Sequence, residues 1–152
     1  MAEGGLNLPP RAPTFAPGDV LHWPPERFRY DMREADTRER VNRMEVADRH
    51  RDLVWGPPMV LPAGRWRATV RLAFDRWSCR HKYCFEFRAA QKHVKHEFTP
   101  GREGVFEFIA EHSWEKLATA EVRVRMIESS LGGLFEFQGA KVELCPDPIH
   151  PS

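Results

Sequence analysis

The chain has 152 residues, of which 41% are hydrophobic and 30% are charged, and its formal net charge is +1. This length fits one domain with a real core, and the composition excludes a disordered chain. The near-neutral charge argues against a dedicated nucleic-acid binder, which carries a basic surface.

No apolar run approaches the roughly 18–20 residues that span a bilayer. Residues 1–15 lack the basic and apolar regions of a secretory signal. We therefore expect no nucleic-acid or membrane partner and a cytoplasmic location. The three cysteines are Cys79, Cys84 and Cys145. Free thiols are expected in a reducing compartment, although spacing alone leaves a Cys79–Cys84 bridge open.

Residues 1–30 are expected to form an extended, proline-rich N-terminal arm, because six prolines and three glycines in this stretch forbid a long helix. The arm also carries too many apolar residues for a solvated tail: Phe15, Val20, Leu21, Trp23, Phe28 and Tyr30. Its second half should therefore dock on the domain or on a neighbouring chain. Residues 31–152 are expected to form a single domain.

Residues 31–50 are nearly all charged, and their pattern suits either a helix or a strand. A helix this polar would bury very little. We favour a short strand near residues 42–47.

From Arg51 onward the sequence predicts strands. The apolar run at 53–55 is expected to stop at Gly56-Pro57-Pro58, and Gly139 is expected to break a later run. The clearest period-two alternation covers 65–74, and further alternating segments lie at 83–88, 94–98, 106–110, 122–126, 135–137 and 142–144. About eight short strands with turn signals every 8–12 residues or so indicate an all-β fold, an antiparallel β-sandwich of jelly-roll type. Trp55 and Trp66 are predicted to be core residues.

Two stretches carry a family resemblance, and they read GPPMVLPAGRWRATVRL (56–72) and FEFQGAKVEL (135–144). The chain resembles jelly-roll carbohydrate-binding modules over about residues 51–145. The resemblance lies in turns and core positions. It implies sugar binding by exposed aromatics, arginines and carboxylates of a concave face or of edge loops.

Two tryptophans are the candidate stacking platforms for a sugar, Trp77 and Trp114, because each is expected in a polar loop between strands. Arg88, Arg123 and Arg125 are the candidate hydrogen-bond donors. Each has an alternative interpretation. A tryptophan at a strand end can cap the core, and arginines on a wet sheet face pair with carboxylates of neighbouring strands without any ligand.

Metal binding is a weaker hypothesis. Cys79, His81 and Cys84 could supply three zinc ligands, but their spacing misses the usual zinc pattern. His93 and His96 would lie on opposite faces of a strand. No catalytic motif is present in the sequence, so we expect no catalytic residues, metal or cofactor.

Three functions follow from these observations. The first is a non-catalytic carbohydrate-binding module in a bacterial glycan or polysaccharide context. The second is a structural protein that forms homo-oligomers through the apolar arm residues Phe15, Leu21, Trp23 and Phe28. The third is a small metal-dependent enzyme of cupin-like shape.

Overall fold

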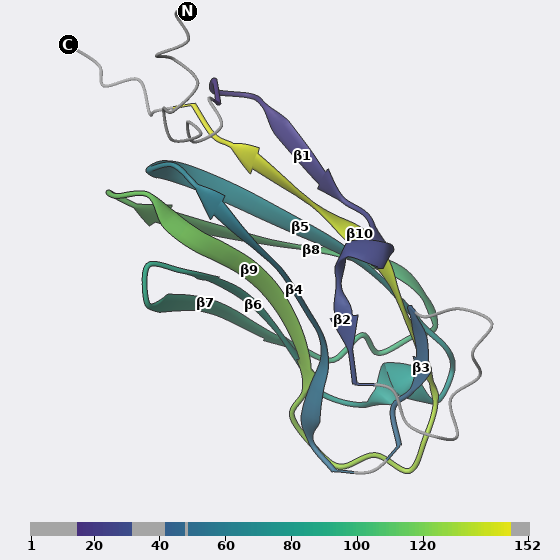
Figure 1. Ribbon diagram of the computed structural model, residues 1–152. Coiled ribbons are helices and arrows are strands. Elements are labelled where there is room, and N and C mark those ends of the chain that lie inside the picture. The colour runs from purple at the N-terminus through teal and green to yellow at the C-terminus, as the bar shows by residue number, and fades with distance from the viewer. Residues whose placement is uncertain (1–14, 32–41, 48, 147–152) are drawn as a thin grey trace, which may run out of the picture.

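Two antiparallel sheets pack face to face in the computed structural model, which describes residues 15–31, 42–47 and 49–146 (Figure 1). The first sheet has the order β1 (Val20–Trp23), β10 (Leu134–Leu144), β5 (Gly64–Phe74), β8 (Gly104–Trp114), and β3 (Arg43–Glu45) also pairs with β10. The second has the order β2 (Arg29–Tyr30), β4 (Arg51–Leu61), β9 (Ala118–Met126), β6 (Tyr83–Ala89), β7 (Lys92–Phe98). The predicted antiparallel β-sandwich is confirmed.

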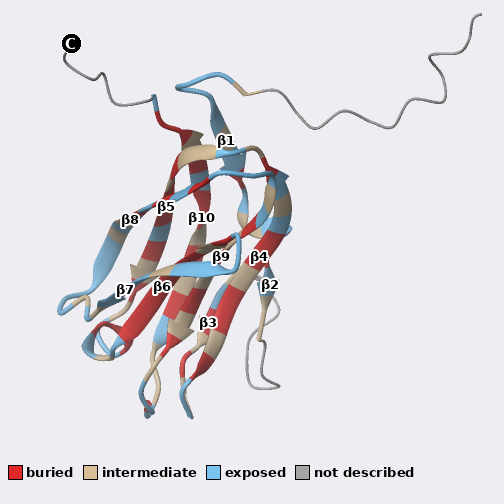
Figure 2. Ribbon diagram, turned by 90° about the vertical axis from the view of Figure 1, so that its left-hand side faces the viewer, coloured by how far each residue is buried: buried red, intermediate tan, exposed pale blue. Residues whose placement is uncertain are grey.

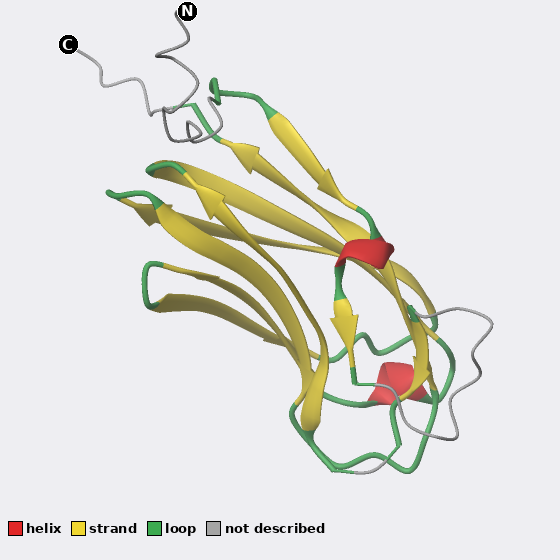
Figure 3. Ribbon diagram, viewed as in Figure 1, coloured by secondary structure: helices red, strands yellow, loops and turns green. Residues whose placement is uncertain are grey.

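Helical structure is confined, over the described ranges, to two single-turn segments, η2 (Pro25–Arg27) and η3 (Ser78–Arg80) (Figure 3). Neither has the length or apolarity of a membrane span. Strand β3 confirms the short strand expected near residues 42–47. The rest of the charged stretch at 32–41 and position 48 lie outside the described residues.

The core lies between the sheets and follows directly from period-two alternation. Every second residue of β5 from Trp66 to Phe74 is buried, and the residues between them face outward or are only half-buried, apart from Thr69. Strands β6 and β9 present Phe85, Phe87 and Val122 to the same interior. Figure 2 shows the resulting bands of buried residues along the strands. Each such side chain contributes about 1.5–3 kcal/mol on burial.

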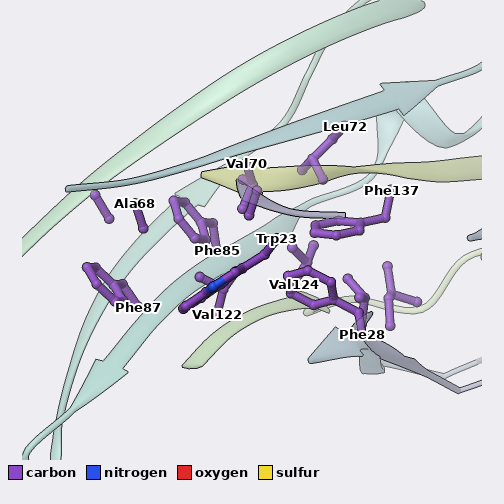
Figure 4. Packing of buried hydrophobic residues seen from close by; sticks show 14 of the residues in the cluster. Trp23, Phe28, Ala68, Val70, Leu72, Phe85, Phe87, Val122, Val124 and Phe137 are labelled. Atoms are coloured by element: carbon purple, nitrogen blue, oxygen red, sulfur yellow. The ribbon is translucent and has the colours of Figure 1, made fainter. Parts of the chain in front are cut away.

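The second half of the N-terminal arm docks on its own domain. Strand β1 pairs with β10 from Val20 to Trp23, and the side chains of Trp23 and Phe28 are buried in the core. Figure 4 shows both among residues of the two sheets. Phe15 packs edge-on against Trp66 with 5.3 Å between ring centroids. Residues 1–14 of the expected arm lie outside the described residues.

Two of the strand ends predicted from the sequence are wrong. Strand β4 runs through Gly56-Pro57-Pro58 to Leu61, and β10 runs through Gly139. In both places the pairing register shifts instead, between Gly56 and Met59 and between Phe137 and Ala140. Such a bulge tolerates a proline, which has no N–H for the ladder, and a glycine with positive φ.

Candidate functional site

Trp77 lies in the loop that crosses from β5 to β6, and its side chain is 50% exposed. It borders a depression of about 490 Å³ that is lined by Arg80, His81, Leu131, Gly132 and Gly133 besides Trp77 itself. Leu131 is fully exposed at its edge. An aromatic ring, an aliphatic side chain and polar donors therefore meet at one end of the sandwich.

The Trp77 loop is held by the carboxylate of Asp75. The Oδ1 atom accepts the N–H groups of Trp77 (3.0 Å) and Ser78 (2.8 Å), and Oδ2 accepts the N–H of Leu134 (2.9 Å). This is an Asx turn, in which a short acidic side chain replaces backbone partners. The turn presents the Trp77 ring outward.

Burial and hydrogen bonding shift the pKa of Asp75 in opposite directions. Burial by itself would raise its pKa, but the hydrogen bonds from Ser78, Leu134 and Trp77 outweigh burial and hold the pKa below its ordinary value. The carboxylate is therefore charged at neutral pH and occupied by backbone donors.

Ser78 links this loop to the loop before β10. Its hydroxyl donates to the carbonyl of Leu134 at 2.6 Å, and the hydroxyl of Tyr83 donates to the carbonyl of Ser78 at 2.6 Å. Gly133 lies so close that a Cβ there would meet the Ser78 backbone. The two loops that line the depression are thus packed backbone to backbone.

The three candidate arginines come together elsewhere, on the outer face of the second sheet. The pairing of β6 with β9 places Arg123 opposite Glu86 and Arg88 opposite Glu121, with Arg125 one step further along the same face. Their guanidinium groups are paired with carboxylates of the same face. Arg88 bonds to Glu86 (2.9 Å), and Arg123 pairs with Glu121 (3.1 Å).

Glu86 is the centre of this network, and its side chain is 0% exposed. Arg88, Arg125 (3.5 Å) and Lys95 (3.7 Å) surround its carboxylate. Burial would raise its pKa, yet these cations outweigh burial and lower the pKa below its usual value. Asp52 on β4 completes the network with ion pairs to Arg123 and Arg125. The cross-strand pairing that needs no ligand is therefore present on this face.

Trp114 does not lie in a loop, which corrects its expected position. It is the last residue of β8 and is 6% exposed. Its ring stacks on Trp66 with 6.2 Å between centroids, and its indole N–H donates to the Leu61 carbonyl at 3.4 Å. The alternation from Phe106 continues through Ala110 and His112, so an inward position was readable from the sequence. Trp114 lines a depression of about 640 Å³ together with Arg65, Lys92 and Glu115, but little of its ring is open to a sugar.

Trp55 differs from its predicted core position as well. It is half-buried, pairs in register with Arg123, and lies beneath that guanidinium at 5.9 Å. A register shift between Asp52 and Val54 turns it to the outer face. Trp66, in contrast, is fully buried as predicted.

The candidate metal ligands are dispersed. Cys79 packs in the core, Cys84 lies on the outer side of β6, and burial raises the pKa of the Cys84 thiol. His93 and His96 lie three residues apart on β7, which places them on opposite faces as expected. Within the ranges that the structure covers, no three His, Cys, Asp or Glu side chains are placed to hold a metal ion.

A second depression of about 470 Å³ lies on the outer face of the first sheet. Its polar lining includes His22, Arg71, Glu107, Gln138 and Lys141. Trp23, the aromatic residue in its lining, is buried. It therefore lacks the exposed ring that distinguishes the depression at Trp77.

The sequence matches no protein-family model and no curated protein sequence. Solved structures do resemble the fold. One contains the CBM22-1 and GH10 modules of xylanase 10B from Clostridium thermocellum in complex with xylohexaose (TM-score 0.56, 9% identity); the match covers 90% of this chain and 30% of that one. Another is the CBM22-1 xylan-binding domain of Xyn10C from Paenibacillus barcinonensis (TM-score 0.52, 8% identity), with 89% and 100% covered. The chain thus has a β-sandwich fold like that of carbohydrate-binding modules, in agreement with the resemblance in its sequence.

Proposed function

We propose that the chain is a non-catalytic carbohydrate-binding module and that the depression at Trp77 is its site. The half-exposed indole of Trp77 beside polar donors is the observation that carries this proposal. The fold supports it, because the two similar structures are described as xylan-binding or hold xylohexaose. The bacterial glycan context remains part of the proposal.

Stacking on Trp77 supplies the apolar part of binding. One face of a pyranose ring presents C–H groups, whereas its hydroxyls lie at the rim. The indole contacts the C–H face, and Arg80 and His81 lie at the same depression to hydrogen-bond the rim. Leu131 extends the apolar wall. The arrangement is that of a shallow site with one aromatic platform and few polar contacts.

The loop is organised before any ligand arrives. Asp75 and Ser78 together fix the backbone on both sides of Trp77 through bonds to Leu134. A preformed loop loses little conformational freedom on binding, which favours affinity.

The arginine face is a second proposed contact surface with weaker support. Arg88, Arg123 and Arg125 are already paired with Asp52, Glu86 and Glu121, so a sugar would have to compete with ion pairs. Trp55 is half-buried under Arg123 and offers only part of its ring. The depression at Trp77 is therefore the better candidate.

Titration calorimetry against a panel of oligosaccharides, preceded by a glycan array, tests the proposal. We expect binding by the full chain and loss of binding in Trp77→Ala. Leu117→Ala is the matched control, because Leu117 is an exposed apolar residue in the β8–β9 turn at the other end of the sandwich. No binding to any sugar would overturn the function. Binding that survives Trp77→Ala but is lost in Arg123→Gln would move the site to the arginine face.

The oligomer hypothesis finds less support in the described residues. Trp23 and Phe28 are buried in their own domain, and Phe15 and Leu21 pack against its core. Phe15 and Leu21 are only partly buried, but with the other two enclosed the arm leaves little apolar surface to pair with a second copy. Light scattering on the full chain tests this alternative, which requires an oligomer, and a monomer would overturn it.

A further inference from the structure

Two arginines accompany Trp77, and neither was a candidate in the sequence. The guanidinium carbon of Arg76 lies 4.9 Å from the centroid of the Trp77 ring, and that of Arg80 lies 5.5 Å from it. Arg80 also lines the depression, together with His81. The exposed ring is thus in contact with two guanidinium groups.

These two guanidinium groups are not neutralised by the part of the chain that the structure describes. Neither has a carboxylate within ion-pair distance there, and the Trp77 ring is the contact that each makes. The arginines of the sheet face differ, since Arg88, Arg123 and Arg125 each pair with a carboxylate. The arginines of the sheet face thus have carboxylate partners, whereas Arg76 and Arg80 have none among the described residues.

The carboxylates that border the Trp77 loop are engaged elsewhere. Asp75 accepts three backbone N–H groups. Glu128 accepts the N–H of Lys82 at 2.9 Å and lies 3.9 Å from the His81 ring. The carboxylate of Glu45 approaches Gly132, but Glu45 does not line the depression. None of these carboxylates forms an ion pair with Arg76 or Arg80, so the aromatic wall of the depression carries two guanidinium groups whose contact among the described residues is the Trp77 ring.

We infer that the depression at Trp77 takes an acidic sugar unit, with the pyranose ring on the indole and its carboxylate or sulfate bound by Arg80 and Arg76. This inference rests on the proposed function and specifies its ligand class.

The cost of displacing a guanidinium distinguishes acidic from neutral sugars. A sugar that stacks on an indole face covered by a guanidinium group must move that group off the ring, which loses a cation–π contact. In exchange, a neutral sugar offers the displaced guanidinium only hydrogen bonds to its hydroxyls. An acidic sugar accepts charge-assisted, bidentate hydrogen bonds from the guanidinium, which are stronger and match the planar geometry of that group. The site as built therefore favours the anion.

Calorimetry with matched ligands tests the inference. The probes are trigalacturonate and its fully methyl-esterified form, which share one backbone and differ in charge. A sulfated disaccharide and its unsulfated parent form a second pair, and xylohexaose is the neutral reference. We expect at least one acidic probe to bind about tenfold more tightly than its neutral partner, equivalent to ~1.4 kcal/mol, with affinity that falls as salt is added. The pair that shows the difference identifies the anion.

Two variants locate the effect. Arg80→Gln should lose about tenfold in affinity for the acidic probe and clearly less for its neutral partner, so that the ratio of the two affinities shrinks. Arg102→Gln is the matched control, because Arg102 is an exposed arginine over another aromatic ring, Phe106, at 5.4 Å, and lies outside the depression. It should bind as the unaltered chain does.

The outcomes separate the two proposals. Equal or tighter binding of the neutral partners would overturn the acidic preference and leave the carbohydrate-binding function standing. Acidic binding unchanged by Arg80→Gln and by Arg76→Gln would also overturn it. Failure of every saccharide to bind would remove the proposed function, and the inference with it.

Discussion

Asp75 and Leu134, 59 positions apart in the chain, bond to each other in both directions. The N–H of Leu134 donates to the Asp75 carboxylate at 2.9 Å, and the N–H of Asp75 donates to the Leu134 carbonyl at 3.2 Å. This double link joins the loop that carries Trp77 to the start of β10. The proposed ligand site and the stability of this end of the sandwich therefore depend on the same carboxylate.

Asp75→Asn should lower stability and remove one acid-sensitive step. The folded pKa of Asp75 is depressed, so its contribution is complete above the unfolded pKa of about 3.9 and is lost as pH falls through the folded pKa. We expect a loss of about 1–2 kcal/mol at neutral pH, from weakened bonds to the carboxylate. Denaturant unfolding between acidic and neutral pH measures both effects.

Asp19→Asn provides the comparison. Asp19 caps an exposed turn by accepting the N–H of Ala16 at 2.7 Å, far along the chain from the Trp77 loop. This variant should keep the acid-sensitive step. A pH profile of Asp75→Asn that matches that of the unaltered chain would contradict the role assigned to Asp75.

Gly133→Ala should destabilise the loop packing through a steric clash. A Cβ at Gly133 would approach the Ser78 Cα to 2.8 Å, and the φ of Gly133 is +129°. Gly104→Ala isolates the steric part, because Gly104 has a similar φ of +140° and open space around its Cβ position. Both variants pay for backbone strain of about 1–3 kcal/mol, and Gly133→Ala should lose more. Thermal unfolding measures the difference, and equal losses would contradict the close contact.

Glu86→Gln should destabilise the second sheet by about 1–3 kcal/mol, since it removes the charge that Arg88, Arg125 and Lys95 share. The exposed pair of Glu107 with Arg71 is the control, and Glu107→Gln should change stability by less than about 1 kcal/mol. Denaturant titration decides between them. Comparable effects of the two variants would show that burial of Glu86 has no energetic consequence.

Trp114→Ala should act on stability, whereas Trp77→Ala should act on ligand binding. Removal of the buried, stacked Trp114 should cost about 3–5 kcal/mol of stability. Removal of the exposed Trp77 should cost about 0.5 kcal/mol or less and act on ligand binding instead. Unfolding curves of the two variants, measured side by side, provide the check. A severely destabilised Trp77→Ala would show that the ring supports the fold.

Individual residues show where sequence reasoning succeeded and where it failed. The strand at 65–74 and the core position of Trp66 were predictable, because alternation is a local property of the chain. Trp114 was predictable in principle from the same alternation. Trp55 was not, since the register shift that turns it outward depends on the pairing of β4 with β9.

The sequence by itself determined that this chain alternates inward and outward residues over strand after strand, and hence that it forms a sandwich with Trp77 outside the strands. Only the tertiary structure decided which loops meet and which charges are cancelled. Leu131 and Gly133 reach Trp77 because the two sheets bring their crossing loops together. Arg125 is neutralised and Arg80 is not, because pairing between distant strands places carboxylates beside the first and none of the described ones beside the second.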